Sequence, residues 1–114
     1  MVEDEPLVAQ ELVARLRSIG CQVLGPATSL GAARRLLDRE TPAAALLDVK
    51  IRGQNVSRIA KRLAETGVPF AVVTGFPRLA SEHEVLRTAP ILTKPVTQRD
   101  IERTLRSLLS RWPP

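Results

Sequence analysis

The sequence predicts an open α/β domain in which a parallel sheet is covered by helices on both faces. Short apolar runs alternate with stretches of helical periodicity, and short links join them. Two of the runs, AAALLD at 43–48 and PFAVVTG at 69–75, are continuously apolar, which is typical of strands buried on both faces. Right-handed crossovers make such a fold doubly wound, and its ligands bind beyond the carboxyl ends of the strands.

The first half of the chain contains two predicted helices with a predicted strand between them. Pro6 suits the first turn of a helix, and apolar residues at helical spacing continue until Gly20. Residues 21–27 predict a short strand closed by Gly-Pro. Ser29 is a suitable cap for the second helix, which ends before Thr41-Pro42.

The second half continues the alternation after the strand at 43–48. Residues 49–55 predict a loop, and a third helix follows and ends at Gly67. After the strand at 69–75, residues 77–88 are polar and weakly periodic, which predicts a loose helix, and residues 91–95 predict a last short strand. The stripe of the final helix consists of Ile101, Leu105, Leu108, Leu109 and Trp112.

The predicted first strand is nearly missing. The pattern requires a strand before Glu3, yet only Met1 and Val2 precede that residue. A gap at the centre of a sheet would leave backbone groups and apolar surface exposed. We therefore expect that the natural protein starts earlier, or that another chain or segment fills the gap. The intact mass of the protein from its native host tests the earlier start, which a mass matching residues 1–114 would contradict.

Length and composition predict a single domain spanning residues 1–114. Apolar residues make up 44% of the chain and charged residues 25%, which favours a packed core over disorder. No apolar run approaches the ~20 residues that a membrane span needs, and the acidic N-terminus does not resemble a signal peptide. The lone Cys21 fits a reducing compartment. The expected location is the cytoplasm, without membrane attachment.

The chain is basic, with 17 Lys and Arg against 12 Asp and Glu and a net charge of +5. The arginines are spread over several predicted helices, and the only aromatic residues are Phe70, Phe76 and Trp112. Because a nucleic-acid site needs clustered charge or stacking platforms, this pattern favours a solvated basic surface over a nucleic-acid partner.

Polar side chains gather at the predicted strand ends. Glu3 and Asp4 follow the first strand, and Asp48, Thr74 and Lys94 each end a later one. These ends converge on one edge of a doubly wound sheet, where the carboxylates need a cation such as Mg²⁺. A carboxylate beside Mg²⁺ can attack phosphorus, and an ammonium and a hydroxyl can stabilise the transferred group.

VEDE at 2–5, the acid ending 43–48, VTG at 73–75 and LTKP at 92–95 occur in the order of a known family. In this order and alternation, the chain resembles a response-regulator receiver domain over essentially its whole length except the first strand. The resemblance implies a flavodoxin-like doubly wound sheet with strand order 2-1-3-4-5. It also implies a signalling module, not an enzyme, in which Asp48 accepts a phosphoryl group from the phosphohistidine of a sensor histidine kinase or phosphotransfer protein.

The resemblance further implies a magnesium site. Asp4 would ligate Mg²⁺ directly, Glu3 would act more through water, and Asp48 would complete the acidic set. The backbone carbonyl of Lys50 would be a further ligand.

The same resemblance assigns the residues that hold the phosphoryl group. Thr74 would donate a hydrogen bond to it, and Gly75 is small enough to let it in. Lys94 would pair with the phosphoryl group or with Asp48, and receivers usually hold the peptide bond from Lys94 to Pro95 in the cis form.

Residues 68–76, VPFAVVTGF, are similar to the corresponding strand of the alphaproteobacterial receivers named for their FAT GUY motif. These receivers typically lack an aromatic switch on the last strand, and that position here is Ile91. The response to phosphorylation is therefore expected elsewhere, in residues 76–88.

The sequence leaves three classes of function open. The favoured class is a stand-alone receiver that binds a partner or drains phosphate from a kinase. The second is a phosphorylation-independent interaction scaffold, whose basic surface could contact nucleic acid. The third, a hydrolytic enzyme, is disfavoured because the chain has no Gly-rich phosphate loop and no Ser/His/Asp set. The downstream partner is not identified, and a homodimer stays open.

Overall fold

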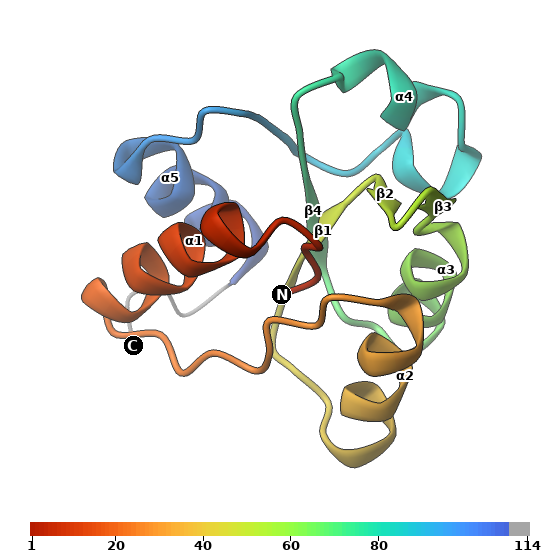
Figure 1. Cartoon of the computed structure of the whole chain (residues 1–114), viewed down its shortest axis with the longest axis horizontal. Helices are drawn as coiled ribbons and strands as arrows, with labels where there is room; N and C mark the ends of the chain where they lie inside the picture. Colours follow the sequence, from red (N-terminus) through yellow and green to blue (C-terminus); the bar gives the residue numbers. More distant parts are fainter. Residues whose placement is uncertain (110–114) are drawn as a thin grey trace.

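A parallel sheet runs through the middle of the molecule (Figure 1). The computed structural model describes residues 1–109. Its sheet contains β1 (Ala45–Asp48), β4 (Phe70–Thr74) and β5 (Ile91–Thr93), in the order β1-β4-β5. Both neighbouring pairs are parallel.

Val2 occupies the position of a first strand beside β1. It forms parallel bridges to Ala27 on one side and to Leu47 on the other. The Val2 N–H donates to the carbonyl of Leu46 at 2.9 Å, and the Asp48 N–H donates to the carbonyl of Val2 at 3.0 Å. The lateral order is thus the Ala27 segment, Val2, β1, β4 and β5. This confirms the predicted order 2-1-3-4-5 and the reduced first strand.

The predicted strand at 21–27 is wrong except at Ala27. A strand needs a partner for its backbone groups, and the neighbouring first strand is too short to supply one. Three bonds join this segment to the first strand: the Ala27 N–H donates to the carbonyl of Met1 at 2.8 Å, the Glu3 N–H to the carbonyl of Ala27 at 3.0 Å, and the Met1 ammonium to the carbonyl of Leu24 at 2.9 Å. Gly25 is required beside this contact, because a Cβ there would lie 2.9 Å from the carbonyl oxygen of Met1.

Helices cover both faces of the sheet, as predicted. The helices α1 (Pro6–Ser18) and α5 (Gln98–Leu108) lie together on one face (Figure 1). The opposite face is covered by α2 (Leu30–Arg39), α3 (Ser57–Glu65), α4 (Pro77–Ser81) and the 3₁₀ turn η1 (Glu84–Leu86). In the part of the chain that the structure describes, no helix combines the length and apolar character that a membrane span requires.

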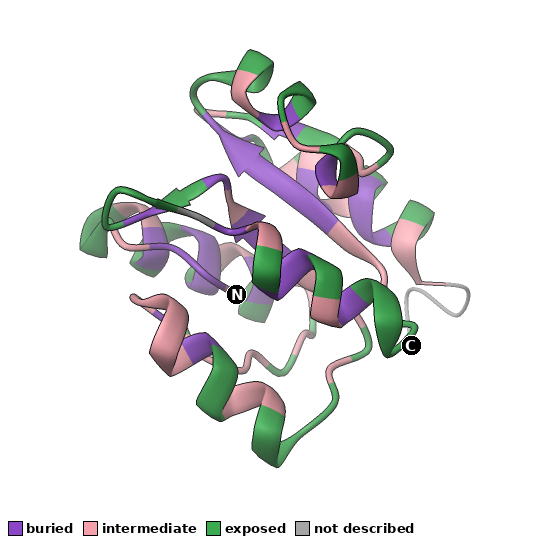
Figure 2. Cartoon of the chain, turned by 90° about the vertical axis from the view of Figure 1, so that its right-hand side faces the viewer, coloured by how far each residue is buried: buried purple, intermediate pink, exposed green. Residues whose placement is uncertain are grey.

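The core has one layer on each face of the sheet, because side chains alternate along each strand. Leu47 and Val72 pack towards α2 and α3, whereas Leu46, Ala71 and Val73 pack towards α1 and α5. The central strand β4 is accordingly buried along most of its length (Figure 2), as are Leu46 and Leu47 in the middle of β1. A rigid sheet buried in this way holds the side chains at its carboxyl end in fixed positions.

Two loops contain more structure than the sequence predicted. Residues 49–55, expected to be a plain loop, form an antiparallel hairpin of β2 (Lys50–Ile51) and β3 (Gln54–Asn55). Arg52 and Gly53 both have positive φ at its tip, as a tight hairpin turn requires. The loose helix predicted at 77–88 appears as α4 followed by η1. Trp112, predicted for the last helix stripe, lies outside the described residues.

Candidate functional site

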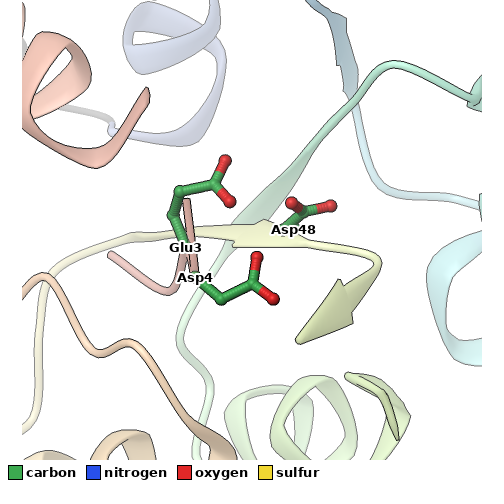
Figure 3. A group of neighbouring side chains, drawn as sticks. All are labelled: Glu3, Asp4 and Asp48. Carbon is green, nitrogen blue, oxygen red and sulfur yellow. The ribbon is translucent and has the colours of Figure 1, made fainter. Parts of the chain in front are cut away.

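Three carboxylates meet at the carboxyl end of the sheet (Figure 3). Glu3 and Asp4 directly follow the strand position of Val2, and Asp48 is the last residue of β1. One oxygen from each carboxylate lies within 4.8 Å of the others. The sequence pattern predicted this cluster, because the two strand positions are neighbours in the sheet.

Lys94 supplies the cation that faces these acids. Its Nζ lies 2.7 Å from Oε1 of Glu3 and 3.0 Å from Oδ2 of Asp48, with Oε1 of Glu5 further away at 3.9 Å. The Lys94 N–H also donates to the carbonyl of Thr74 at 2.9 Å, which fixes the backbone just beyond β5 against the end of β4. Lys94 follows the edge strand β5, yet its side chain contacts acids at the two neighbouring strand positions of Val2 and β1.

Burial affects the pKa of both Glu3 and Lys94. Glu3 is 1% exposed, and this burial, together with the nearby Asp48, raises its pKa to about 7 even though Lys94 opposes the shift. Burial lowers the pKa of Lys94, but its hydrogen bonds to Glu3 and Asp48 outweigh that effect, so the net shift is upward. Lys94 therefore stays charged, whereas Glu3 is poised between its two forms near neutral pH and would be deprotonated by an added cation.

Thr74 lies at the end of β4 and is 2% exposed. The strand register pairs Asp48 with Val73, so Thr74 is one residue beyond the position opposite the acid. Its Oγ1 accepts a hydrogen bond from the Phe76 N–H at 3.0 Å. Because the hydroxyl is the acceptor in that bond, its own proton remains available for donation to a ligand.

Lys50 is not part of the side-chain cluster. It begins β2, two residues after Asp48, and its side chain is exposed. The structure thus brings together the side chains of Glu3, Asp4, Asp48 and Lys94, with Thr74 beside them at the end of β4.

Arg52 contacts the acidic cluster, and sequence reasoning missed it. Its backbone N–H donates to Oδ2 of Asp4 at 2.7 Å, and its Nε donates to the carbonyl of Thr28 at 3.1 Å. Arg52 has φ of 52°, an unusual value for a non-glycine residue. The following Gly53 is the sequence signal that could have indicated a tight turn here.

The ligand atoms fit a hard dication. Carboxylate oxygens are the donors that Mg²⁺ prefers, and one or two carboxylates with waters usually hold it. Arg52 occupies Oδ2 of Asp4 and Lys94 occupies Oδ2 of Asp48. An ionised carboxylate has about four acceptor sites, so these contacts leave each aspartate able to ligate a cation, and the donor set is suitable for Mg²⁺.

Comparison with known proteins identifies the family, although no protein-family model matches the chain. The receiver domain of the response regulator PhyR from Erythrobacter litoralis superimposes with a TM-score of 0.82, at 25% identity, over 95% of this chain and 85% of that one. SdrG from Sphingomonas melonis Fr1 gives a TM-score of 0.81 at 30% identity, over 94% of this chain and 91% of that one. The chain is a response-regulator receiver domain.

This receiver is also 36% identical over 111 residues to the positive alginate biosynthesis regulatory protein of Pseudomonas aeruginosa. The match covers 93% of this chain and 44% of that protein, so the chain spans less than half the length of this curated relative.

One backbone detail expected of a receiver is present. The peptide bond from Lys94 to Pro95 is cis, as expected. Ile91, at the position of the usual aromatic switch, is 41% exposed, and Phe76 beyond Thr74 is 72% exposed. The bond from Gly25 to Pro26 is also cis, which the sequence did not indicate.

Proposed function

We propose that this receiver accepts a phosphoryl group on Asp48 from the phosphohistidine of a sensor histidine kinase or a histidine phosphotransfer protein. The observation that carries the proposal is the juxtaposition of Glu3, Asp4 and Asp48 within 4.8 Å, with Lys94 Nζ 3.0 Å from Asp48. Such an arrangement offers a nucleophilic carboxylate, a cation site and a fixed ammonium in one place.

Asp48 would act as the nucleophile through one carboxylate oxygen. As the new O–P bond forms, the P–N bond of the phosphohistidine breaks, and its electron pair returns to the imidazole nitrogen. Oδ2 of Asp48 is the oxygen that accepts the hydrogen bond from Lys94 Nζ, at 3.0 Å. Oδ1 is therefore the oxygen we assign to attack or to metal ligation.

Lys94 and Thr74 would stabilise the transferred group. The Lys94 ammonium can move from the carboxylates to a phosphoryl oxygen, and Thr74 can donate its hydroxyl proton to another. Both are held by the backbone bond between them, at 2.9 Å, so their spacing is set before the reaction begins.

Glu3, Asp4, Asp48 and the backbone carbonyl of Lys50 are the proposed magnesium ligands. Bound Mg²⁺ would neutralise the acids and the developing charge on the phosphoryl oxygens. Arg52 holds Asp4 in position through its N–H, so the hairpin β2–β3 supports the metal site.

The phosphorylated receiver would signal by binding a protein partner, or it would drain phosphate from its kinase. Phe76 is exposed directly beyond Thr74 and begins the segment 76–88, which contains only the short helix α4 and η1. We assign the response to phosphorylation to this segment, since Ile91 cannot act as an aromatic switch.

The test is labelling with acetyl phosphate, followed by mapping of the modified residue by mass spectrometry. We expect Mg²⁺-dependent phosphorylation at Asp48 that is lost in Asp48→Asn and after removal of Mg²⁺ with a chelator. Asp38→Asn is the matched control, because Asp38 is an exposed residue paired with Arg62 on the α2–α3 surface and should leave labelling unchanged.

Failure of the folded wild-type protein to label, with beryllofluoride also without effect, would contradict the proposal. The phosphorylation-independent scaffold would then be the better interpretation. Binding of nucleic acid by such a scaffold would weaken steeply as the salt concentration rises.

A further inference from the structure

The hairpin β2–β3 lies beside the acidic site, and its tip is formed by Arg52 and Gly53. The base of the hairpin is fixed in the core, because Val49, Ile51 and Val56 are each 1% exposed or less and the Val56 N–H donates to the carbonyl of Val49 at 2.9 Å. Both tip residues are exposed, and a Cβ on Gly53 would meet nothing within 4 Å beyond its chain neighbours. Core packing therefore does not set the position of the tip.

Arg52 connects this tip to two other segments. Its backbone N–H donates to Oδ2 of Asp4 at 2.7 Å, and its side-chain Nε donates to the carbonyl of Thr28 at 3.1 Å. These two acceptors lie on neighbouring segments, since the Glu3 N–H donates to the carbonyl of Ala27 at 3.0 Å. The side chain thus ties the tip to the edge of the sheet, and the backbone ties it to a carboxylate of the acidic site (Figure 3).

The backbone of Arg52 has an unfavourable conformation. Its φ of 52° lies in the left-handed region, which is uncommon for a residue other than glycine and persists where the surrounding structure enforces it, often at a functional site. Glycine would adopt this conformation at no steric cost. An arginine here indicates a contribution from the side chain, and the bond from Nε to the Thr28 carbonyl is such a contribution.

We propose that Arg52 is a positioning residue for the magnesium site. Its side chain anchors the hairpin tip to the Thr28 carbonyl, and the anchored tip keeps the Arg52 N–H on Oδ2 of Asp4. Asp4 is thereby held in the acidic group with Glu3 and Asp48, and a ligand that is already ordered loses less freedom when a cation binds. The effect on Mg²⁺ affinity rests on the proposed function, whereas the orientation of Asp4 does not.

Charge and position act in opposite directions at this residue. The guanidinium is positive, so its charge alone would repel a nearby dication, and removing it would tighten the binding of Mg²⁺. Positioning predicts the reverse, because loss of the Nε donor would free the tip and weaken the binding. A pair of uncharged variants that differ only in the donor separates the two effects.

The experiment compares Arg52→Gln with Arg52→Met. Both side chains are uncharged and of similar length, and Nε2 of glutamine lies as many bonds from Cα as Nε of arginine, so the glutamine variant keeps a donor that the methionine variant lacks. Calorimetric titration measures the affinity for Mg²⁺. We expect the methionine variant to bind Mg²⁺ at least about threefold more weakly than the glutamine variant.

Amide exchange in the metal-free protein measures the positioning itself. After correction for intrinsic rates, we expect the amide at position 52 to be about tenfold less protected in the methionine variant than in the glutamine variant. The thermal unfolding midpoints of the two variants should be equal, because residue 52 is exposed. A purely structural role would instead lower the midpoint of the methionine variant and leave the affinity for Mg²⁺ equal in the two.

Arg58→Met is the matched control, since Arg58 is exposed in the first turn of α3 and its loss removes the same charge. Weaker Mg²⁺ binding in this control would show that the effect does not come from the Arg52 hydrogen bond and would overturn the proposal. Should Arg52→Met fail to fold, Arg52→Gly, which suits a positive φ and also lacks the donor, takes its place against the glutamine variant.

Equal protection of the amide at position 52 in the two variants would overturn the positioning role. Equal affinities for Mg²⁺ alongside different protection would overturn the effect on the metal and leave the orientation of Asp4 established. Absence of Mg²⁺ binding from the unaltered protein would count against the proposed function, whereas the exchange measurement would still decide whether Arg52 positions Asp4.

Discussion

Lys94 illustrates how one residue at the site depends on several strands. Its ammonium contacts Glu3 and Asp48, which come from two neighbouring strand positions, and its N–H bonds to Thr74 on a third. Because both carboxylates raise its pKa, it remains an ammonium throughout the neutral range. The sequence predicted that Lys94 ends the last strand, and the structure places it directly after β5, with its ammonium beside Glu3 and Asp48.

Arg52, in contrast, could not be identified from the sequence. The identity of its side chain gives no hint of the contact to Asp4, because that contact comes from the backbone N–H. A backbone donor has no sequence signature of its own. Only the hairpin turn, with Arg52 at φ 52° and Gly53 at φ 78°, aims this N–H at the carboxylate.

The lifetime of the proposed phosphoryl group should depend on Lys50 and Phe76. Both side chains are exposed and follow Asp48 and Thr74 by two residues, so they border the expected position of the group. Lys50 adds positive charge, and Phe76 hinders the attacking water. We predict that the double variant Lys50→Asn, Phe76→Ala loses phosphate about tenfold faster, corresponding to about 1.4 kcal/mol in the barrier.

Release of phosphate from the labelled protein, followed by gel shift or mass, checks this prediction. Lys61→Asn is the control, because Lys61 is an exposed lysine on α3 and should leave the rate unchanged. Slower loss of phosphate in the double variant than in the parent would show that the prediction is wrong.

At the scale of elements, the helices follow local signals closely. Ser29 was predicted as the cap of α2, and its Oγ accepts from the Ala32 N–H at 3.1 Å. Pro6 is the first residue of α1, as predicted. These signals act over three or four residues, so the sequence alone is enough to find them.

The helix α5 starts at a capping box that the strand–helix pattern did not single out. The Asp100 N–H donates to Oγ1 of Thr97 at 3.1 Å, and the Thr97 N–H donates to Oδ2 of Asp100 at 3.4 Å. Thr97→Ala should therefore lower the free energy of unfolding by about 1 kcal/mol. Urea denaturation followed by circular dichroism measures the change.

Thr88→Ala is the matched control for the cap. Thr88 is exposed in the turn after η1, and we expect its substitution to change the stability by no more than about 0.5 kcal/mol. Equal losses in the two variants would mean that the capping box does not stabilise α5.

Strands depended less on local sequence than helices did. The segment 21–27 has a strand-like sequence, yet only Ala27 pairs, whereas the hairpin at 50–55 formed in a segment expected to be a loop. A strand exists only if another segment supplies its hydrogen-bond partners. Pairing is therefore decided by tertiary structure.

At the scale of the whole molecule, β1 holds the two layers of the core and the acidic site together. Leu46 packs on one face, Leu47 on the other, and Asp48 follows at the edge. Any rearrangement of β1 would move the carboxylate relative to Lys94. Stability and site geometry are consequently linked in this strand.

Truncation of Leu47 should destabilise the whole domain. Leu47 is 0% exposed, and Leu47→Ala removes buried methyl groups and leaves a cavity, so we predict a loss of about 2–5 kcal/mol in the free energy of unfolding. The measurement is urea denaturation with a global fit. The control Leu7→Ala, at a side chain that is 80% exposed on α1, should leave the unfolding midpoint nearly unchanged.

The sequence by itself determined the alternation of strands and helices, the helix caps and the order of the site residues. These depend on periodicity and on contacts a few residues apart, which a linear pattern contains. Tertiary structure decided that the carboxylates of Glu3, Asp4 and Asp48 lie within 4.8 Å, that the Arg52 N–H reaches Asp4, and that an apolar cavity remains beside Met1. Each of these depends on how segments far apart in the chain pack and pair, because a backbone donor, a strand partner or an empty volume is defined only by its neighbours in space.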